Sequence, residues 1–145
     1  MASNFNGTTP AAPAGSKNVT WQTDGAGNDS AYYLSPFDVN VFTAGVNTNN
    51  QKMWRQQVLR ACKFPASATN SKAEGSVAST GTVVYAIKKN GTGFATITFT
   101  ASATGVWAQA SDATFAAGDL LEVDAPAVAD GTLADVSINL WGYLT

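Results

Sequence analysis

Histidine is absent from this sequence of 145 residues, and cysteine occurs only once, as Cys62. Without histidine, a serine or cysteine nucleophile would need an unusual partner to activate it. A single cysteine allows neither a disulfide within the chain nor a cysteine-based zinc site. We therefore expect no enzymatic activity and no cofactor, and we expect Cys62 to be a buried structural residue.

Charge is also scarce, because Asp, Glu, Lys and Arg make up only 12% of the residues, about half the usual share. Residues 52–89 contain seven Lys or Arg and one Glu, which gives +6, whereas residues 112–135 contain six Asp or Glu and no basic residue. This polarity could pair one subunit with another, or it could give two solvated faces of opposite sign. The basic segment is too sparse to predict binding to nucleic acid.

Long hydrophobic runs are missing, since no stretch approaches the 18 apolar residues that a membrane span needs. The first residues, MASNFNGTTP, include neither the basic segment nor the apolar segment of an export signal. We expect no membrane association. We also expect synthesis in the cytoplasm, where the protein stays until it is assembled or released by lysis.

Short segments of alternating polarity are what the sequence does contain. Phe37, Val39 and Val41 alternate with Asp38 and Asn40, and similar runs recur in TGVWAQA, DLLEVDA and LADVSINLWGYL. The length suits one domain with one core. We predict an all-β fold, a single antiparallel β-sandwich or jelly-roll-like domain over residues 18–145.

Other segments are assigned by composition. Residues 1–17 are rich in Ala, Pro, Gly, Ser and Thr, and they predict a flexible N-terminal arm. Residues 52–64 suit either a helix face or a strand, and we favour the strand. Residues 65–81 consist of small residues and predict a loop.

The stretch WQTDGAGNDSAYY raises three alternatives: a metal loop, a phosphate cradle and a turn. A calcium loop of the EF-hand type would need an oxygen ligand where Ala26 stands and a bidentate glutamate where Ser35 stands, and a phosphate loop would need a third glycine and a following helix. The Asp-Gly and Gly-Asn pairs are typical of hairpin connections. We predict a turn.

Asn90-Gly91 is the strongest turn signal in the chain. A strict two-residue turn would place Tyr85 opposite Thr96, mixing apolar and polar side chains on one face. We therefore predict a three-residue loop with a bulge, which slips the register by one residue. The predicted partners are Val83 with Phe99, Tyr85 with Ile97, and Ile87 with Ala95.

Acidic residues are the remaining candidates for chemistry. Glu122 and Asp124, two positions apart on a predicted strand, would hold their carboxylates ~6–7 Å apart, which approaches the spacing in an inverting glycosidase. Calcium at Asp119, Glu122, Asp124 or Asp130 is another alternative. Because Glu122 and Asp124 alternate with apolar residues, we favour a solvent-facing pair and assign no catalytic or metal site.

Aromatic residues are the candidates for binding. The alternation predicts that Trp107, Trp141 and Tyr143 point away from the core, and large exposed aromatics typically mark a contact. We assign them to a subunit interface, with cover by a loop of the same chain and a sugar-stacking platform as alternatives. The candidate residues for binding to a partner protein or a neighbouring chain are Phe5, Trp21, Tyr32 and Tyr33.

The run from YAIKKNGTGF to ADVSINLWG, residues 85–142, resembles the β-rich domain found at the C-terminal ends of many tailed-bacteriophage tail and fibre proteins. The shared features are the Lys-Asn-Gly-Thr hairpin, FAAGD at Phe115–Asp119, APA-x-AD at Ala125–Asp130 and TLADVSI at Thr132–Ile138. The segment PAAPAGSKNVTWQTDGAGNDSAYY is similar to one that often precedes such domains. The resemblance implies a β-rich fold and membership of a virion.

The chain has no heptads or repeats that would form a fibre shaft. A short β-domain with an N-terminal arm resembles instead a small capsid decoration, or cement, protein. Such proteins usually form homotrimers that bind the major capsid protein from outside and stabilise the shell. The resemblance thus implies a location on the capsid surface of the virion. The alternative is a receptor-binding tail-fibre or spike tip that recognises a host surface glycan or protein.

Overall fold

The computed structural model describes residues 19–23, 29–33, 35–66 and 70–145, with side chains from Ser35 onward. Contacts within the chain define two compact units, Met1–Ser35 and Pro36–Thr145. The division places the segment 18–35, which we assigned to the β-domain, with the N-terminal unit. The predicted arm, including Phe5, lies outside the described residues.

The N-terminal unit contains an antiparallel pair of strands, β1 (Val19–Thr23) and β2 (Asp29–Tyr33). Trp21 pairs with Ala31, and Thr23 pairs with Asp29. The pairing confirms the predicted hairpin. The connecting residues 24–28 and the side chains of Trp21, Tyr32 and Tyr33 lie outside the described part of the chain, so their assignment to partner binding stays a prediction.

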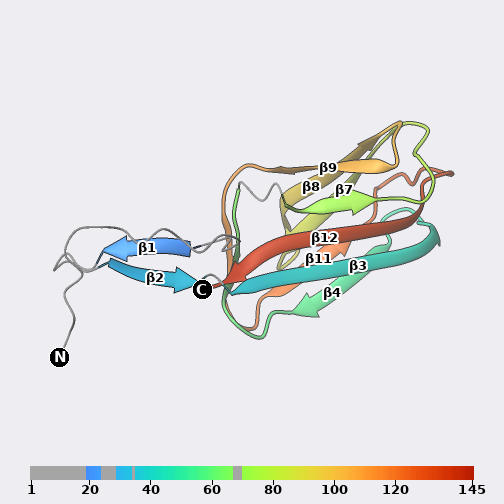
Figure 1. Ribbon diagram of the computed structural model, residues 1–145. Coiled ribbons are helices and arrows are strands. Elements are labelled where there is room, and N and C mark those ends of the chain that lie inside the picture. Colours follow the sequence, from blue (N-terminus) through green and yellow to red (C-terminus); the bar gives the residue numbers. More distant parts are fainter. Residues whose placement is uncertain (1–18, 24–28, 34, 67–69) are drawn as a thin grey trace, which may run out of the picture. The chain divides into compact units, whose positions relative to one another are not determined.

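The larger unit is built of strands, and its described residues include no helix (Figure 1). This confirms the all-β prediction. The strands are β3 (Pro36–Val46), β4 (Lys52–Gln57), β5 (Cys62–Phe64), β6 (Lys72–Glu74), β7 (Thr82–Lys89), β8 (Thr92–Thr100), β9 (Thr104–Gln109), β10 (Ala113–Phe115), β11 (Leu120–Asp124) and β12 (Ala134–Leu144).

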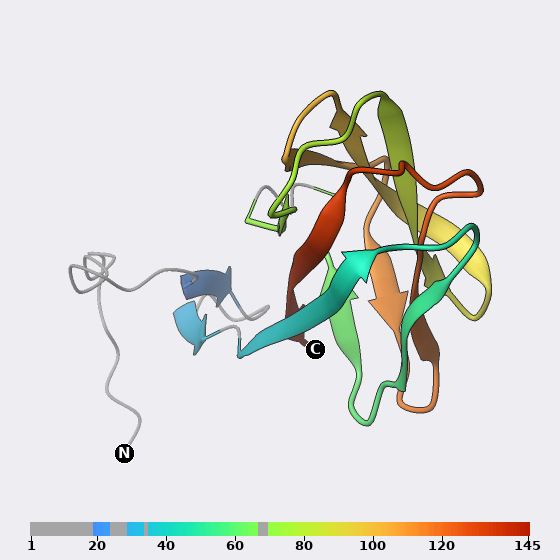
Figure 2. The same cartoon turned by 90° about the vertical axis from the view of Figure 1, so that its right-hand side faces the viewer.

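These ten strands form one antiparallel ladder in the order β10-β5-β12-β6-β9-β8-β7-β11-β4, with β3 on the other edge of β12. The β6–β9 pairing joins a group around β12 to a group around β7 and β8. Figures 1 and 2 show the strands curving around a common interior. This arrangement is compatible with the expected sandwich.

Two stretches of the chain test the assignments made from composition. The segment 52–64 forms β4 and β5, so the choice of strand over helix is confirmed. The segment 65–81, predicted as a loop, contains the short strand β6, and there the prediction is wrong. The strand was missed because its segment consists mainly of small residues. Its Ala73 is buried, and β6 pairs with β12 on one side and β9 on the other.

The core lies between the inward faces of these strands. Val39 and Val41 are buried on β3, as their alternation predicts. Phe64 packs edge-on against Phe115 with ring centroids 5.5 Å apart, an arrangement that adds to the hydrophobic gain of burial. The largest fully buried side chains are Tyr85, Phe64, Phe99, Phe115, Ile87, Ile97, Leu121, Ile138 and Leu140.

The β7–β8 hairpin has the register that the sequence predicts, with Val83 opposite Phe99, Tyr85 opposite Ile97, and Ile87 opposite Ala95. The predicted three-residue loop is wrong. Asn90 and Gly91 alone form the turn, with φ of 48° and 82°, because both tolerate the positive φ that a type I′ turn requires. The extra residue is Phe94, at a bulge between the pairs Ile87–Ala95 and Lys88–Gly93.

Candidate functional site

The basic and acidic segments of the sequence pair with each other inside one chain. Strand β11 lies between β4 and β7, so its acidic residues have basic neighbours on both sides. Charges that are neutralised in this way are not free to attract another subunit. The ion pairs are Lys52–Glu122, Lys52–Asp124, Arg55–Glu122, Lys63–Asp112, Lys88–Asp124 and Lys89–Asp119.

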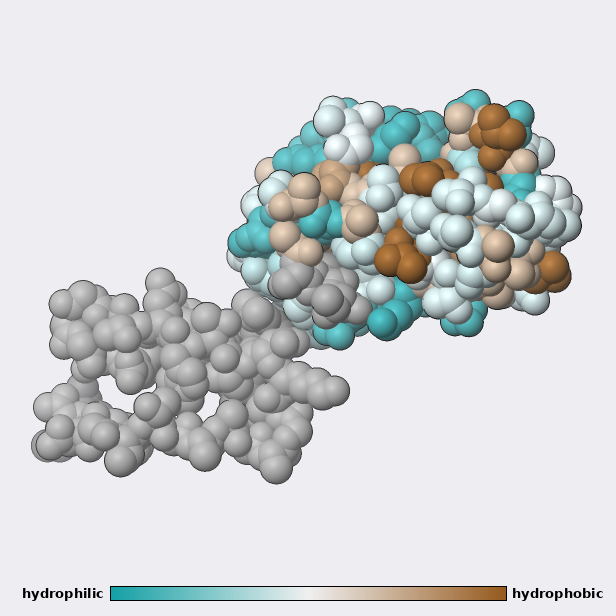
Figure 3. All heavy atoms as spheres, turned by 90° about the horizontal axis from the view of Figure 1, so that it is seen from above, coloured by the Kyte–Doolittle hydropathy of each residue, from teal (hydrophilic) through white to brown (hydrophobic). Residues whose placement is uncertain are grey.

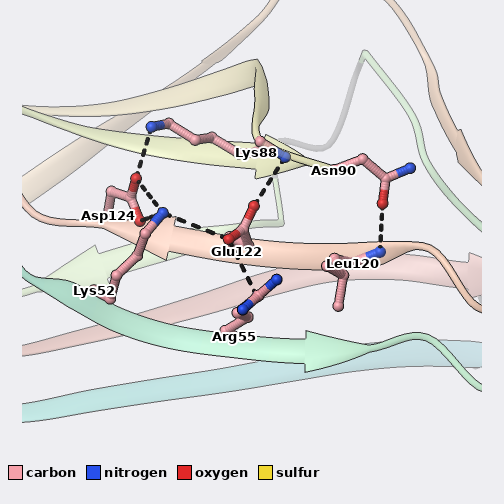
Figure 4. A network of polar contacts seen from close by, with 8 residues as sticks. Lys52, Arg55, Lys88, Asn90, Leu120, Glu122 and Asp124 are labelled. Atoms are coloured by element: carbon pink, nitrogen blue, oxygen red, sulfur yellow. Dashed lines mark hydrogen bonds and ion pairs between the residues drawn. The ribbon is translucent and has the colours of Figure 1, made fainter.

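Glu122 and Asp124 lie at the centre of this network (Figure 4). Asp124 contacts the Nζ atoms of Lys88 and Lys52 at 2.6 and 2.9 Å, and Glu122 accepts the Gly91 N–H at 2.9 Å. Only 5% of Glu122 and 8% of Asp124 is exposed. The expectation of a solvent-facing pair is therefore wrong, because long basic side chains from both neighbouring strands cover the carboxylates.

The electrostatics of Asp124 do not suit acid catalysis. Burial raises its pKa, but hydrogen bonds from Lys88 and Lys52 outweigh that effect, and the net shift is downward. A glycosidase acid requires a raised pKa instead. We conclude that this carboxylate serves to hold β4, β11 and β7 together.

The other acidic candidates stabilise turns. Asp119 accepts hydrogen bonds from the Ala116 N–H and from Asn90, and Asp130 accepts them from Thr80, Thr132 and the Leu133 N–H. Within the described residues, no three His, Cys, Asp or Glu side chains group together in a way that could hold a metal ion.

Cys62 is fully buried, as predicted. Burial, reinforced by the nearby Asp119 carboxylate, raises the pKa of its thiol to about 11. Since the thiolate is the reactive form, this thiol is inert at neutral pH.

Strand β9 presents the opposite face from the one that we predicted. Trp107 pairs with Ile97 and packs against the core, whereas Val106 is 66% exposed. The outward orientation predicted for Trp107 is therefore wrong. The packing at Gly105 gives the physical reason. Gly105 lies on the same inward face of β9, where a Cβ would come within 2.6 Å of Ile97 Cγ2. The inward face therefore combines Trp107 with a residue that has no side chain.

The reversal leaves an outer surface on β7, β8 and β9 that is uncharged apart from Lys88 near the end of β7, whose ammonium is paired with Asp124. We call the uncharged part of this surface the neutral face. Val84, Thr98 and Val106 form one cross-strand row on it. A hollow of about 590 Å³ lies along it, lined in part by Thr96 and Ala108. In Figure 3, which views the side where these strands lie, pale neutral residues surround small separate hydrophobic groups. The neutral face consists of Thr82, Val84, Ala86, Thr96, Thr98, Thr100, Thr104, Val106 and Ala108.

Trp141 and Tyr143 lie on the outer face of β12, as the alternation predicts, and they alternate with the buried Leu140 and Gly142. Both are partly exposed, and their ring centroids are 6.3 Å apart. A hollow of about 290 Å³ adjoins Trp141. The subunit interface assigned to Trp107, Trp141 and Tyr143 stays a prediction, and the structure does not bring Trp107 to the outer face with the other two.

Sequence reasoning missed Val106 and Ala108 as surface residues, because an apolar residue at every second position was taken as the mark of the core. The alternation of Gly105, Trp107 and Gln109 was the better indication of which face of β9 is buried. Of these, Gln109 turns inward and donates through Nε2 to the Phe64 carbonyl at 2.8 Å.

Comparison with known proteins gives no identification, since no protein-family model matches the chain and no curated protein is significantly similar to it. None of the described elements is a helix long and apolar enough to cross a membrane.

Proposed function

We propose that this protein is a structural component of a bacteriophage virion: a non-enzymatic capsid decoration protein that binds the outside of the shell and stabilises it. The neutral face of β7, β8 and β9 is the observation that carries the proposal. The sequence resemblance to virion β-domains supports it.

The neutral face suits contact with another protein surface. Burying a charged group costs several kcal/mol unless it gains a partner. The charge next to the neutral face on β7, Lys88, is already paired with Asp124. Val84 and Val106, 42% and 66% exposed, provide apolar area that would be removed from water on contact. We assign the neutral face to association between copies, with a homotrimer as the proposed state.

The N-terminal unit is the proposed contact with the major capsid protein, through Phe5, Trp21, Tyr32 and Tyr33. A trimer would present three such segments to the shell. Linking several weak contacts raises the overall affinity through effective concentration, without new chemistry. A ligand that binds only the assembled shell stabilises it by mass action.

Substitution of Val106 by lysine tests the role of the neutral face. We expect Val106→Lys to shift sedimentation from oligomer to monomer and to reduce retention on capsids stripped of decoration. Val128→Lys is the matched control, because Val128 is 75% exposed and lies outside the neutral face in the β11–β12 connection. Equal behaviour of the two variants would contradict the assignment.

Deletion of residues 1–17 tests the capsid contact separately. The shortened protein should fold and oligomerise normally and yet co-sediment poorly with capsids. Undiminished co-sedimentation would remove the arm, including Phe5, from the proposal.

A receptor-binding tip on a tail fibre or spike is the second candidate, and the partly exposed Trp141–Tyr143 pair favours it. Counting copies in purified virions separates the two functions. A decoration protein should approach the copy number of the shell protein, whereas a tip should be present in a few copies.

A further inference from the structure

We propose that the hollow beside Trp141 is a binding site for a neutral sugar. The inference goes beyond capsid decoration and does not depend on it. The site lies on the outer face of β3 and β12, away from the neutral face in the strand order. Its lining residues are Asp38, Asn40, Asn70, Asn139, Leu140 and Trp141.

The ladder of β3, β12 and β6 fixes the positions of these side chains. Asp38 is the direct partner of Trp141, and Asn40 is the direct partner of Asn139. Directly paired residues share a face, and successive pairs on that face lie ~7 Å apart along the strands. A carboxylate and two amides therefore lie within one step of the indole ring.

The site is supported from below. β12 is paired along both edges, with β3 on one side and β5 and β6 on the other. The backbone N–H of Trp141 donates to Oγ of the buried Ser71 at 3.0 Å. This hydrogen bond holds Ser71, the neighbour of Asn70 in the chain, against β12. The lining residues on the strands are thus positioned by the sheet and need not be ordered by the ligand.

Within the described part of the chain, the polar side chains of the hollow are not engaged by other side chains or by the backbone. Among the hydrogen bonds between described residues, none engages the side chains of Asp38, Asn40, Asn70 or Asn139. Each amide can donate two hydrogen bonds and accept two, and the carboxylate accepts only. Sugar hydroxyl groups donate and accept, so they match this mixed set.

The aromatic ring completes the match. A pyranose has one face covered by C–H groups and a rim of hydroxyl groups, so it needs an apolar plate bordered by polar side chains. Trp141 provides such a plate, with Tyr143 beside it. The volume of about 290 Å³ is at the lower end of ordinary ligand pockets, which hold ~300–1,000 Å³. It fits the end of a glycan better than a long chain.

Other ligand classes fit the lining less well. Asp38, the direct partner of Trp141, would repel an acidic sugar or a phosphate beside the ring, whereas Lys72, the direct partner of Asn139 on β6, is not a lining residue. One carboxylate is too few for a hard cation, which takes six or more oxygen ligands. The core of a protein interface is depleted in charged residues, whereas this hollow includes the Asp38 carboxylate. The lining therefore favours a neutral glycan over a second copy of the chain.

The test is an array of immobilised glycans, carrying neutral hexose and N-acetylhexosamine ends beside sialylated and uronate-containing ones, probed with the full-length labelled protein. We expect binding confined to neutral glycans, competed by the corresponding free monosaccharide. Trp141→Ala and Asp38→Asn should each weaken the best interaction at least tenfold. Asn139→Ala provides a further variant in case Trp141→Ala fails to fold.

Two matched controls lie on the same sheet outside the hollow. Phe42→Ala removes another exposed aromatic residue of β3, and Glu74→Gln removes an exposed carboxylate of β6. Both should leave glycan binding unchanged.

Three results would overturn the proposal. The first is the absence of binding to every neutral glycan, and the second is binding that Trp141→Ala, Asp38→Asn and Asn139→Ala leave intact. The third is a change of sedimenting mass in Trp141→Ala without any glycan binding by the parent protein, which would assign Trp141 to the subunit interface instead. None of these results depends on whether the protein decorates a capsid.

Discussion

Replacing Glu122 with glutamine tests whether the polar network over β11 stabilises the sheet. The carboxylate accepts the Gly91 N–H through Oε2 at 2.9 Å, and its Oε1 atom faces Lys52 and Arg55 at 3.5 and 3.4 Å. Glutamine has nearly the same shape but only one acceptor oxygen. Its NH2 group must then face either the Gly91 N–H or the two cations.

The magnitude follows from the exposure of each partner. The side chains of Lys52 and Arg55 are 56% and 60% exposed, so water can replace the lost ion pairs, which contribute ~0–1 kcal/mol each. The amide of the variant is buried against another donor, and a buried donor without an acceptor costs ~1–3 kcal/mol. We expect Glu122→Gln to lower the free energy of unfolding by ~2–3 kcal/mol, mainly through the second effect.

Urea unfolding followed by circular dichroism measures this change. With a slope of ~1–3 kcal/mol per molar urea, the midpoint should fall by ~1 M or more. Glu74→Gln is the matched control, because Glu74 is exposed on β6 and makes no ion pair within the described part of the chain; it should change stability by less than ~0.5 kcal/mol. If Glu122→Gln and Glu74→Gln were equally stable, the polar network would not contribute to the stability of the sheet.

Three further predictions concern acid stability, packing and thiol reactivity. Hydrogen bonds from Asn90 and the Ala116 N–H, together with Lys89, lower the pKa of Asp119 to about 2; because this pKa is depressed on folding, the stabilisation is complete above about pH 4 and is lost as the pH falls through about 2. Calorimetry should show a flatter decline of Tm over that range in Asp119→Asn, and an unchanged decline would contradict the assignment. Gly105→Ala, whose Cβ would lie 2.6 Å from Ile97, should destabilise the fold by ~1–3 kcal/mol, and Gly93→Ala, with open space around it, should not. The Cys62 thiol should react with an aromatic disulfide reagent only after unfolding, and rapid reaction of the native protein would show that its burial is incomplete.

Much of the fold was predictable because buried strands carry a period of two. The alternation of β3, β7 and β8 identified the correct inward residues, and it gave the register of the hairpin even though the loop length was wrong. That register was predictable because a slip of one residue would have exposed every apolar side chain of both strands. The position of the extra residue was not predictable, because a longer turn and a bulge within the strand give the same register.

The candidate sites were less predictable. On β9 and just after it, the apolar residues Val106, Ala108 and Ala110 outnumber Trp107, yet the single large residue packs inward beside Gly105. Small apolar residues are tolerated on a surface at little cost, so their alternation does not decide which face is buried. The hollow beside Trp141 joins residues of β3 and β12 that are about a hundred positions apart in the chain, and no local pattern predicts that meeting.

The sequence by itself determined the fold class, the position of the strongest turn and the burial of Cys62, since these depend on local periodicity, backbone preferences and the scarcity of charge. Tertiary structure decided where the charges go. By placing β11 between β4 and β7, it brought the basic and acidic halves of the sequence together, because cross-strand neighbours of opposite sign can neutralise each other only after distant segments have paired. It also left most of the outer face of β7, β8 and β9 without charge, and it left Trp141 and Tyr143 partly exposed on the outer face of β12.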